Sequence, residues 1–482
     1  MAHGGIYTTH FTGWNLARQK PTCLNDKILC IRRWKRSDPP NRVRSGSQPT
    51  RGRIGKTEIP EGEIGLQMRR YHLYNNLERR KDISVPVYGC IMRHWKRGDV
   101  AQLLAQKRES SVREVKRIVA SGDTYLLFSA VDTVVDDVFD HIKRQDLSDL
   151  PPIIYREKVD LSSGKVRNIG VESIVQQLYD EVADYAIQPL KRRIGTYQIA
   201  CLKGKGGALG IRAMKRWMRD KRVRWACQCD IKKCYESTDR VKMMAFLRHI
   251  IRDSPRVLWL IETLINTHRR GLNIGCKLSQ DLMNIYLSVL YHEMMKRTMV
   301  VRKRRGREEK HMAVIHTLFQ MDDIVLLCVS RKDTEFAFKQ LHKIAGEMGI
   351  TIKGNWRIFR LDAPNTRGRG KSFLDIVGVR FYRGKATLRR RVYIRAQRAF
   401  AKAERKRRQH KAIRKKLAQR VISYYGSLKW TDHYKLWSKY KVNRIVRICK
   451  EVISNESKIF YKTGCGENRV DGRQNVCFSV SQ

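Results

Sequence analysis

The stretch VIHTLFQMDDIVLLCV, residues 314–329, encloses a pair of adjacent carboxylates between two apolar segments. The apolar flanks predict strands over 315–320 and 324–329, joined by a turn that carries Asp322 and Asp323. Neighbouring carboxylates at the tip of a buried hairpin repel each other and destabilise the fold unless a cation binds there. An Asp-Asp turn alone is common, so its meaning depends on whether another acid joins it.

A further acid ends the apolar strand that the sequence predicts over 223–230. Asp230 could therefore meet Asp322 and Asp323 where strands end. Mg²⁺ prefers oxygen ligands and bridges phosphates, and Mn²⁺ is the alternative ion. Two such ions about 4 Å apart can activate an attacking hydroxyl and stabilise a leaving pyrophosphate. The three aspartates thus predict a two-metal site for phosphoryl transfer.

The net charge of the chain restricts its partners. Its 482 residues include 100 Lys and Arg against 46 Asp and Glu, a net charge of +54, and 42% of them are hydrophobic, enough for a sizeable core. Self-repulsion on this scale argues against most ordinary metabolic enzymes and favours nucleic acid as the partner. An acidic membrane surface is the alternative, but no apolar run approaches the roughly 20 residues of a spanning helix.

The cysteines indicate the compartment. The 12 cysteines are scattered without a CxxC pair, and no secretion pattern opens the chain. Cys227 and Cys229 lie in the strand predicted over 223–230, and side chains two apart point to one face of a strand. We interpret the cysteines as reduced structural thiols of a cytoplasmic protein and expect their closest pairs not to form a metal site.

Composition and periodicity divide the chain into five predicted segments. Seventeen Lys or Arg and a single acid, Glu404, fall between 383 and 420, which indicates either a solvated helix face or a cationic binding surface. The segments are a flexible basic arm (1–60), a helical extension (61–150), a core of alternating strands and helices (151–382), a basic helical module (383–455) and a loose tail (456–482). Helices are expected over 99–121, 124–143, 172–193, 240–268, 279–295 and 334–348, and further strands over 153–155 and 166–169.

Short motifs occur along residues 150–445 in an order that is more specific than any one of them. They are GKVRNI (164–169), YQIACLKGKG (197–206), DIKKCYES (230–237), GLNIGCKLSQ (271–280), FQMDD (319–323), GITIK (349–353), DIVGVRF (375–381) and SYYGSLK (423–429). The set resembles the bacterial reverse transcriptases that include the polymerases of diversity-generating retroelements and related defence-associated enzymes.

The resemblance implies an α+β fold: a right-hand polymerase with fingers, an RRM-like palm of antiparallel strands and helices, and a helical thumb. It implies an RNA-directed DNA polymerase, in which a primer 3′-hydroxyl attacks the α-phosphate of a dNTP with the help of two Mg²⁺ ions. The implied partners are template RNA, primer, cDNA product and dNTPs, with a non-coding RNA or an accessory protein as further candidates and no membrane.

The resemblance also implies roles for individual residues. Asp230, Asp322 and Asp323 would ligate or position the metals, and the Ile231 carbonyl would complete the shell. Lys353 would protonate the leaving pyrophosphate, or alternatively only bind phosphate. Tyr235 would exclude the 2′-hydroxyl of a ribonucleotide, unless it is an ordinary core residue. The remaining candidates are Lys165, Arg167, Lys203 and Lys205 for the triphosphate, or as solvated side chains, and Gly275, Ser279 and Gln280 for template and nucleobase.

Three positions depart from the usual pattern of this group. Gln320 replaces the usual Tyr before Met-Asp-Asp, Asn273 replaces a Pro, and Glu236 replaces a common Pro. None of them removes a metal ligand, but Gln320 could change how the primer end or template is held. Three roles stay open: a mutagenic retroelement enzyme, an antiphage polymerase that copies a dedicated RNA or works without a template, and an RNA-binding protein whose palm is only a scaffold.

Overall fold

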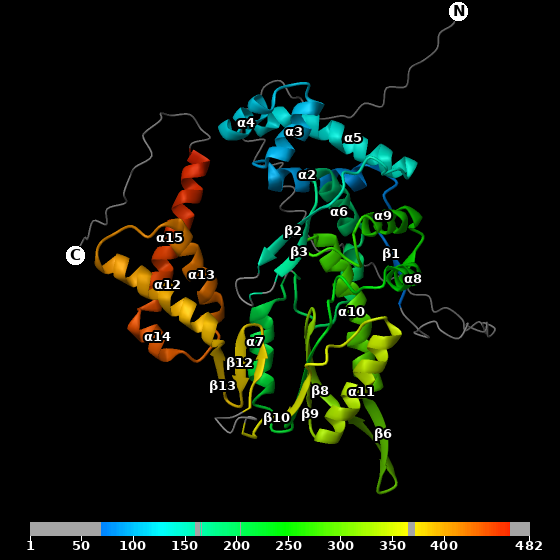
Figure 1. Ribbon diagram of the computed structural model, residues 1–482, viewed down its shortest axis with the longest axis vertical. Helices are drawn as coiled ribbons and strands as arrows, with labels where there is room; N and C mark the ends of the chain where they lie inside the picture. The colour runs from blue at the N-terminus through cyan, green and yellow to red at the C-terminus, as the bar shows by residue number, and fades with distance from the viewer. Residues whose placement is uncertain (1–68, 160–163, 165, 203, 365–371, 463–482) are drawn as a thin grey trace, which may run out of the picture. The chain divides into compact units, whose positions relative to one another are not determined.

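The computed structural model describes residues 69–159, 164, 166–202, 204–364 and 372–462 (Figure 1). The predicted arm over 1–60 and the residues after 462 lie outside this part, as do Lys165 and Lys203. In the described residues, no helix is long and apolar enough to cross a membrane.

A sheet of four antiparallel strands forms the centre of the fold. Its strands are β4 (Trp225–Asp230), β8 (Val314–Gln320), β9 (Asp323–Cys328) and β10 (Arg357–Arg360), in the order β10-β4-β9-β8. Helix α10 (Lys277–Arg297) precedes β8, and α11 (Arg331–Glu347) connects β9 to β10. This strand-helix-strand-strand-helix-strand order, with the first strand central, is the arrangement of an RRM-like palm.

Helices cover both faces of the central sheet, which explains why β9 is buried from Ile324 to Cys328. Helix α11 contacts all four strands, and α10 reaches β8 through Tyr291, whose ring lies 5.4 Å from that of Phe319. On the other side, Leu318 and Val325 share a hydrophobic cluster with α7 (Gly207–Trp217). A strand buried on both faces reads as a continuous apolar run, as β9 does.

The fingers contain an antiparallel hairpin, β2 (Ile154–Val159) and β3 (Val166–Val171), followed by α6 (Ile174–Ala186). The helix predicted over 172–193 ends at Ala186 and continues as a 3₁₀ turn, η2 (Gln188–Arg193). Pro189 explains the change, because it has no N–H for the next α-helical hydrogen bond. The connection to α10 contains α8 (Arg240–Ile250), β5 (Ile251–Arg252) and α9 (Pro255–Asn266), and β5 pairs in parallel with β1 (Tyr71–His72).

The N-terminal extension is helical. It consists of α2 (Arg80–His94), α3 (Gly98–Lys107), α4 (Val112–Ser121), η1 (Thr124–Leu127) and α5 (Phe128–Arg144). The helix predicted over 99–121 is therefore two helices. Glu109 has a left-handed backbone with φ 54°, and the Ser111 side chain caps the second helix by accepting from Glu114 N at 3.2 Å. Helix α2 contacts both α5 and α6.

The C-terminal part is a helical module with its own small sheet. The sheet comprises β11 (Leu374–Ile376), β12 (Val379–Tyr382) and β13 (Lys385–Leu388), and the helices are α12 (Arg390–Arg408), α13 (Lys415–Leu428), α14 (Tyr434–Lys439) and α15 (Val442–Lys462). A separate hairpin, β6 (Met299–Arg304) and β7 (Arg307–Met312), precedes β8. Phe400, Val421 and Ile445 belong to the same hydrophobic cluster as Phe381 and Trp217. The antiparallel palm and the helical thumb-like module confirm the predicted α+β fold class.

Candidate active site

The strand register brings the three aspartates together. Asp230, the last residue of β4, is the Cα partner of Asp323, the first residue of β9. Asp322 lies in the two-residue turn before it, and the Asp322 carbonyl accepts a hydrogen bond from Ile231 N at 2.9 Å. Met321 takes a left-handed backbone with φ 55°, as the mirror-image turns of tight hairpins require.

The electrostatics of Asp322 and Asp323 show that the nearby cations do not offset burial and the repulsion between the carboxylates. Burial raises the pKa of Asp322, the charge of Asp230 raises it further, and Lys353 and Arg167 oppose the shift. Burial, a hydrogen bond with Asp230 and the charges of Asp322 and Asp230 together raise the pKa of Asp323 to about 8. A bound cation would favour the charged carboxylates and reverse these shifts.

Lys353 belongs to the same cluster. Its ammonium group forms an ion pair with the Asp230 carboxylate, and its backbone N–H donates to the Asp230 carbonyl at 2.8 Å. These contacts follow from a short antiparallel bridge between Ile231 and Ile352. The residues on either side of Ile231 form the hydrogen bonds of this bridge, through the Asp230 carbonyl and the Lys232 N–H. The Ile231 carbonyl takes part in neither bond.

The donor set fits divalent magnesium, because it offers carboxylate oxygens and a backbone carbonyl and no softer ligand. Asp230 and Asp322 would hold the ions, with Asp323 and the Ile231 carbonyl beside them. Among the residues described, however, the set of metal-binding side chains whose ligand atoms all lie within 4.8 Å of one another is a different one: Glu172, His268 and Cys276. The aspartates instead contact each other and Lys353.

Two of the four cations predicted for the triphosphate fall in the described part of the chain. Arg167 on β3 lies near enough to Asp322 for its charge to lower the pKa of that carboxyl. The Lys205 ammonium donates to the carbonyls of Ile194 at 3.2 Å and Gly195 at 2.7 Å, and burial lowers its pKa. No described contact joins Lys205 to the aspartates, whereas Arg167 belongs to their surroundings.

Tyr235 lies half-buried beside the aspartates. Burial raises its pKa, and Asp322 is among the charges that raise it further. Its backbone carbonyl accepts from Leu272 N at 2.8 Å. Gly271 has φ +48°, and a Cβ there would lie 2.4 Å from the Tyr235 carbonyl oxygen, so only glycine permits this close approach. The GLNIGCKLSQ loop thereby packs directly against the segment that carries Tyr235.

The other predicted binding residues lie along the same loop and the start of α10. Gly275 is exposed with φ +110°, and a Cβ there would lie 3.2 Å from the Ile169 side chain. Ser279 is buried, and its hydroxyl has no hydrogen-bond partner in the described structure. Gln280 is half-buried on the first turn of α10.

Two of the departures from the expected pattern have structural consequences. Asn273 joins the loop to the fingers, because its side chain accepts from Gly170 N at 3.2 Å and donates to Glu172 Oε1 at 3.0 Å. A proline could make neither bond. Gln320 is the Cα partner of Asp323 at the end of the hairpin, and its Oε1 is buried without a partner among the described residues.

A cavity of about 410 Å³ opens beside the aspartates and contains residues that the sequence motifs did not single out. Arg389 forms an ion pair with Asp375, and its charge lowers the pKa of Asp323. In the sequence, Arg389 is one cation in a long basic run, so only its position beside β12 reveals it. The cavity is lined by Gln228, Cys229, Asp230, Asp323, Asn355, Arg357, Phe373, Asp375 and Arg389.

Comparison with known proteins gives a family for the central part of the chain. Residues 156–355 match the family described as reverse transcriptase (RNA-dependent DNA polymerase). This match identifies a reverse transcriptase domain in the central part of the chain. The matched segment includes Asp230, Asp322, Asp323 and Lys353. No curated protein matches the chain.

Solved structures give only distant similarities. A truncated apo telomerase from Candida tropicalis has 13% identity and a TM-score of 0.34, covering 49% of this chain and 54% of that one. A telomerase from Candida albicans, solved with a fragment of telomeric RNA, has 12% identity and a TM-score of 0.37, covering 67% and 60%. The chain thus spans little more than half the length of these structures, and neither similarity supports a conclusion about its partners.

Proposed function

From the reverse transcriptase domain over residues 156–355, we propose that the chain synthesises cDNA on an RNA template by two-metal nucleotidyl transfer. The observation that carries this proposal is the β4–β9 register, which sets Asp230 beside Asp323 with Asp322 in the adjoining turn. Three half-buried carboxylates side by side repel one another, which is costly for the fold, and a site for divalent cations explains their presence.

In this proposal individual residues of the chain have separate roles in the reaction. Bound Mg²⁺ ions supply electrostatic stabilisation of the attacking and leaving oxygens. Asp230 and Asp322 hold the ions, and Arg167 contributes positive charge toward the triphosphate together with Lys165 and Lys203. Lys353, which forms an ion pair with Asp230, would give a proton to the leaving pyrophosphate. The ring of Tyr235 would exclude the 2′-hydroxyl of the incoming sugar.

The proposed setting is a bacterial retroelement or an antiphage defence system, in the cytoplasm, with a structured RNA as template. Untemplated DNA synthesis is the alternative activity, and RNA binding without catalysis is the alternative role. The intact set of Asp230, Asp322 and Asp323 favours catalysis.

Primer extension by the full chain tests the proposed activity. With a DNA primer annealed to a defined RNA template, Mg²⁺ and dNTPs, we expect product whose sequence complements the template. An Asp322→Ala/Asp323→Ala protein is the inactive control and should give no product. Product of equal length and yield without RNA would replace the proposal with untemplated synthesis. Absence of dNTP incorporation on any template, by protein that still binds RNA, would favour the scaffold role.

The basic face of α12 is proposed to grip the primer–template duplex. Arg398, Lys402 and Arg405 are exposed at helical spacing on this helix. Replacing all three with alanine is expected to weaken duplex binding. The slope of log K against log salt should fall by about one for each phosphate that the variant no longer neutralises. Fluorescence anisotropy over a salt series measures this slope.

The control replaces three exposed cations of another helix, Arg113, Lys116 and Arg117 on α4, and removes the same charge. We expect a smaller change of slope for this control variant. Equal slopes for the α12 variant and the unmodified chain would show that the basic run is only a solvated helix face.

A further inference from the structure

Four metal-binding side chains from separate parts of the chain meet in the interior, away from the three aspartates. Glu172 follows β3, Asp180 lies on α6, His268 follows α9, and Cys276 is the N-cap of α10. Their exposed fractions are 7%, 4%, 4% and 1%, so all are at least nine-tenths buried. An oxygen of Glu172, a nitrogen of His268 and Sγ of Cys276 all lie within 4.8 Å of one another.

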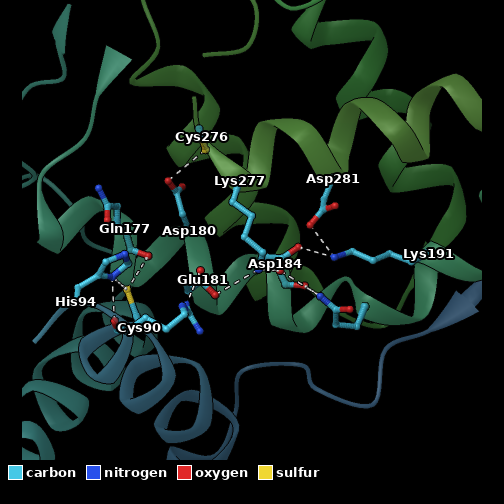
Figure 2. Close-up of polar contacts among 12 residues, drawn as sticks. Cys90, His94, Gln177, Asp180, Glu181, Asp184, Lys191, Cys276, Lys277 and Asp281 are labelled. Carbon is cyan, nitrogen blue, oxygen red and sulfur yellow. Dashed lines mark hydrogen bonds and ion pairs between the residues drawn. The ribbon is translucent and has the colours of Figure 1, made fainter. Parts of the chain in front are cut away.

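Asp180 is not in this set of three, but it lies against the set through Cys276. Cys276 Sγ lies 3.3 Å from Asp180 Oδ2, and Figure 2 shows the two side chains directed toward each other between α6 and the start of α10. Asp180 also shares a hydrogen bond with Glu172. The cluster therefore offers two carboxylates, an imidazole and a thiol.

Several polar atoms of the cluster lack partners among the described residues. Asp180 Oδ1 and His268 Nε2 are buried without any hydrogen-bond partner. The other ring nitrogen, His268 Nδ1, accepts a hydrogen bond from Asn273 N in the loop at 3.2 Å. Burying such atoms unpaired costs free energy, so their convergence calls for a bound group.

The neighbouring cations are committed elsewhere. Lys277 pairs with Asp184 and Glu181, and Lys191 pairs with Asp184 and Asp281 (Figure 2). The cluster therefore holds two buried acids without a described lysine partner. In keeping with this, burial and the charge of Glu172 raise the pKa of Asp180 well above its usual range, and burial raises the pKa of Cys276.

We propose that Glu172, Asp180, His268 and Cys276 bind a single structural transition-metal ion, of which Zn²⁺ is the best match. Zinc takes four ligands from Cys, His, Asp and Glu in closed tetrahedral sites. A thiolate and an imidazole select zinc over magnesium, so this site differs in chemistry from the aspartate site. The N-terminus of α10 favours the thiolate form of Cys276, which caps it.

The histidine is suited to this role. Burial and the Arg240 guanidinium lower the pKa of His268 to about 4, so the ring is neutral at neutral pH. A neutral imidazole is the form that binds a metal.

A metal here would join the fingers to the GLNIGCKLSQ loop. Glu172 follows β3, Asp180 is in α6, and Cys276 begins the helix that carries Ser279 and Gln280. The ion would thus hold the loop in place without contacting the reacting groups. Its role is structural and does not depend on the proposed polymerase activity.

Metal analysis of the full chain tests the site. We purify the Asp322→Ala/Asp323→Ala chain, so that the aspartate site cannot contribute, and measure metals by mass spectrometry after dialysis. We expect one tightly held zinc per chain. Cys276→Ala and His268→Gln are expected to lose it, whereas Cys90→Ala, which removes another buried thiol, is expected to keep it.

Cobalt substitution tests the site without relying on the metal that the protein acquires during expression or on enzymatic activity. Co²⁺ added to chelator-stripped protein should give a thiolate-to-cobalt charge-transfer band and raise the melting temperature, and Cys276→Ala should abolish the band while Cys90→Ala retains it. If stripped wild-type chain takes up neither zinc nor cobalt, or if Asp180→Asn and Cys276→Ala bind as much as wild type, the cluster is a metal-free hydrogen-bond network and the proposal is wrong.

Discussion

Replacing Asp322 with alanine is expected to reduce the rate of nucleotide addition by about 10³-fold or more. A metal ligand at the reacting phosphate contributes several kcal/mol to the stabilisation of the transition state, and each 1.36 kcal/mol is a factor of ten. Asp322 lies in the turn beside Asp230 and Asp323, where no other described carboxylate can replace it. Single-turnover primer extension at saturating Mg²⁺ and dNTP measures the effect.

The same substitution should not weaken the fold. Burial and the Asp230 charge raise the pKa of Asp322, so in the absence of divalent ions its charged form opposes folding. Since a raised carboxyl pKa means that the folded state binds more protons, stability falls as pH rises above the unfolded value. Asp322→Ala should therefore melt at the same temperature as wild type or higher in metal-free buffer at neutral pH. Asp253→Ala, at an exposed aspartate, is the control for activity. Full activity in Asp322→Ala would contradict the assignment.

The second large effect is expected at Lys353. Replacing it with methionine should slow nucleotide addition by about 10²-fold or more, the usual contribution of a general acid. The ammonium group pairs with the Asp230 carboxylate, so its removal also leaves that carboxylate without its cation. Rapid-quench measurement of a single addition, across a pH series, separates these contributions.

Lys353→Arg distinguishes proton donation from charge alone. Arginine keeps the positive charge but cannot donate a proton at accessible pH, because its pKa exceeds 12. Activity restored by arginine would show that Lys353 only binds phosphate. Activity abolished in both variants, with a changed pH profile, supports the general acid. The exposed Lys332→Met is the matched control and should behave as wild type. An unchanged rate in Lys353→Met would exclude both roles.

Local features of the sequence were enough to predict that Asp230, Asp322 and Asp323 meet where strands end. Asp230 and the Asp322–Asp323 pair each interrupt an apolar run, and a buried acid at the end of a strand has few explanations other than a cation. The motif order then predicted the α+β class, which the RRM-like strand order confirms. The prediction of one continuous helix over 99–121 was wrong, because a left-handed residue and a serine cap divide this segment into two helices.

Other features exist only because distant segments fold together. Arg389 reaches the aspartates from the start of the basic run, and Lys205 is directed to the Ile194 and Gly195 carbonyls, which no pattern in its own segment indicates. The cluster of Glu172, Asp180, His268 and Cys276 has no spacing that a motif could capture.

The sequence by itself thus determined the charge of this protein, the three aspartates and the strands that end at them, since burial and periodicity act over a few neighbouring residues. The tertiary structure alone decided which distant cations lie near the aspartates and which side chains form the cluster around Cys276. Strand register and helix packing set the distances between these residues.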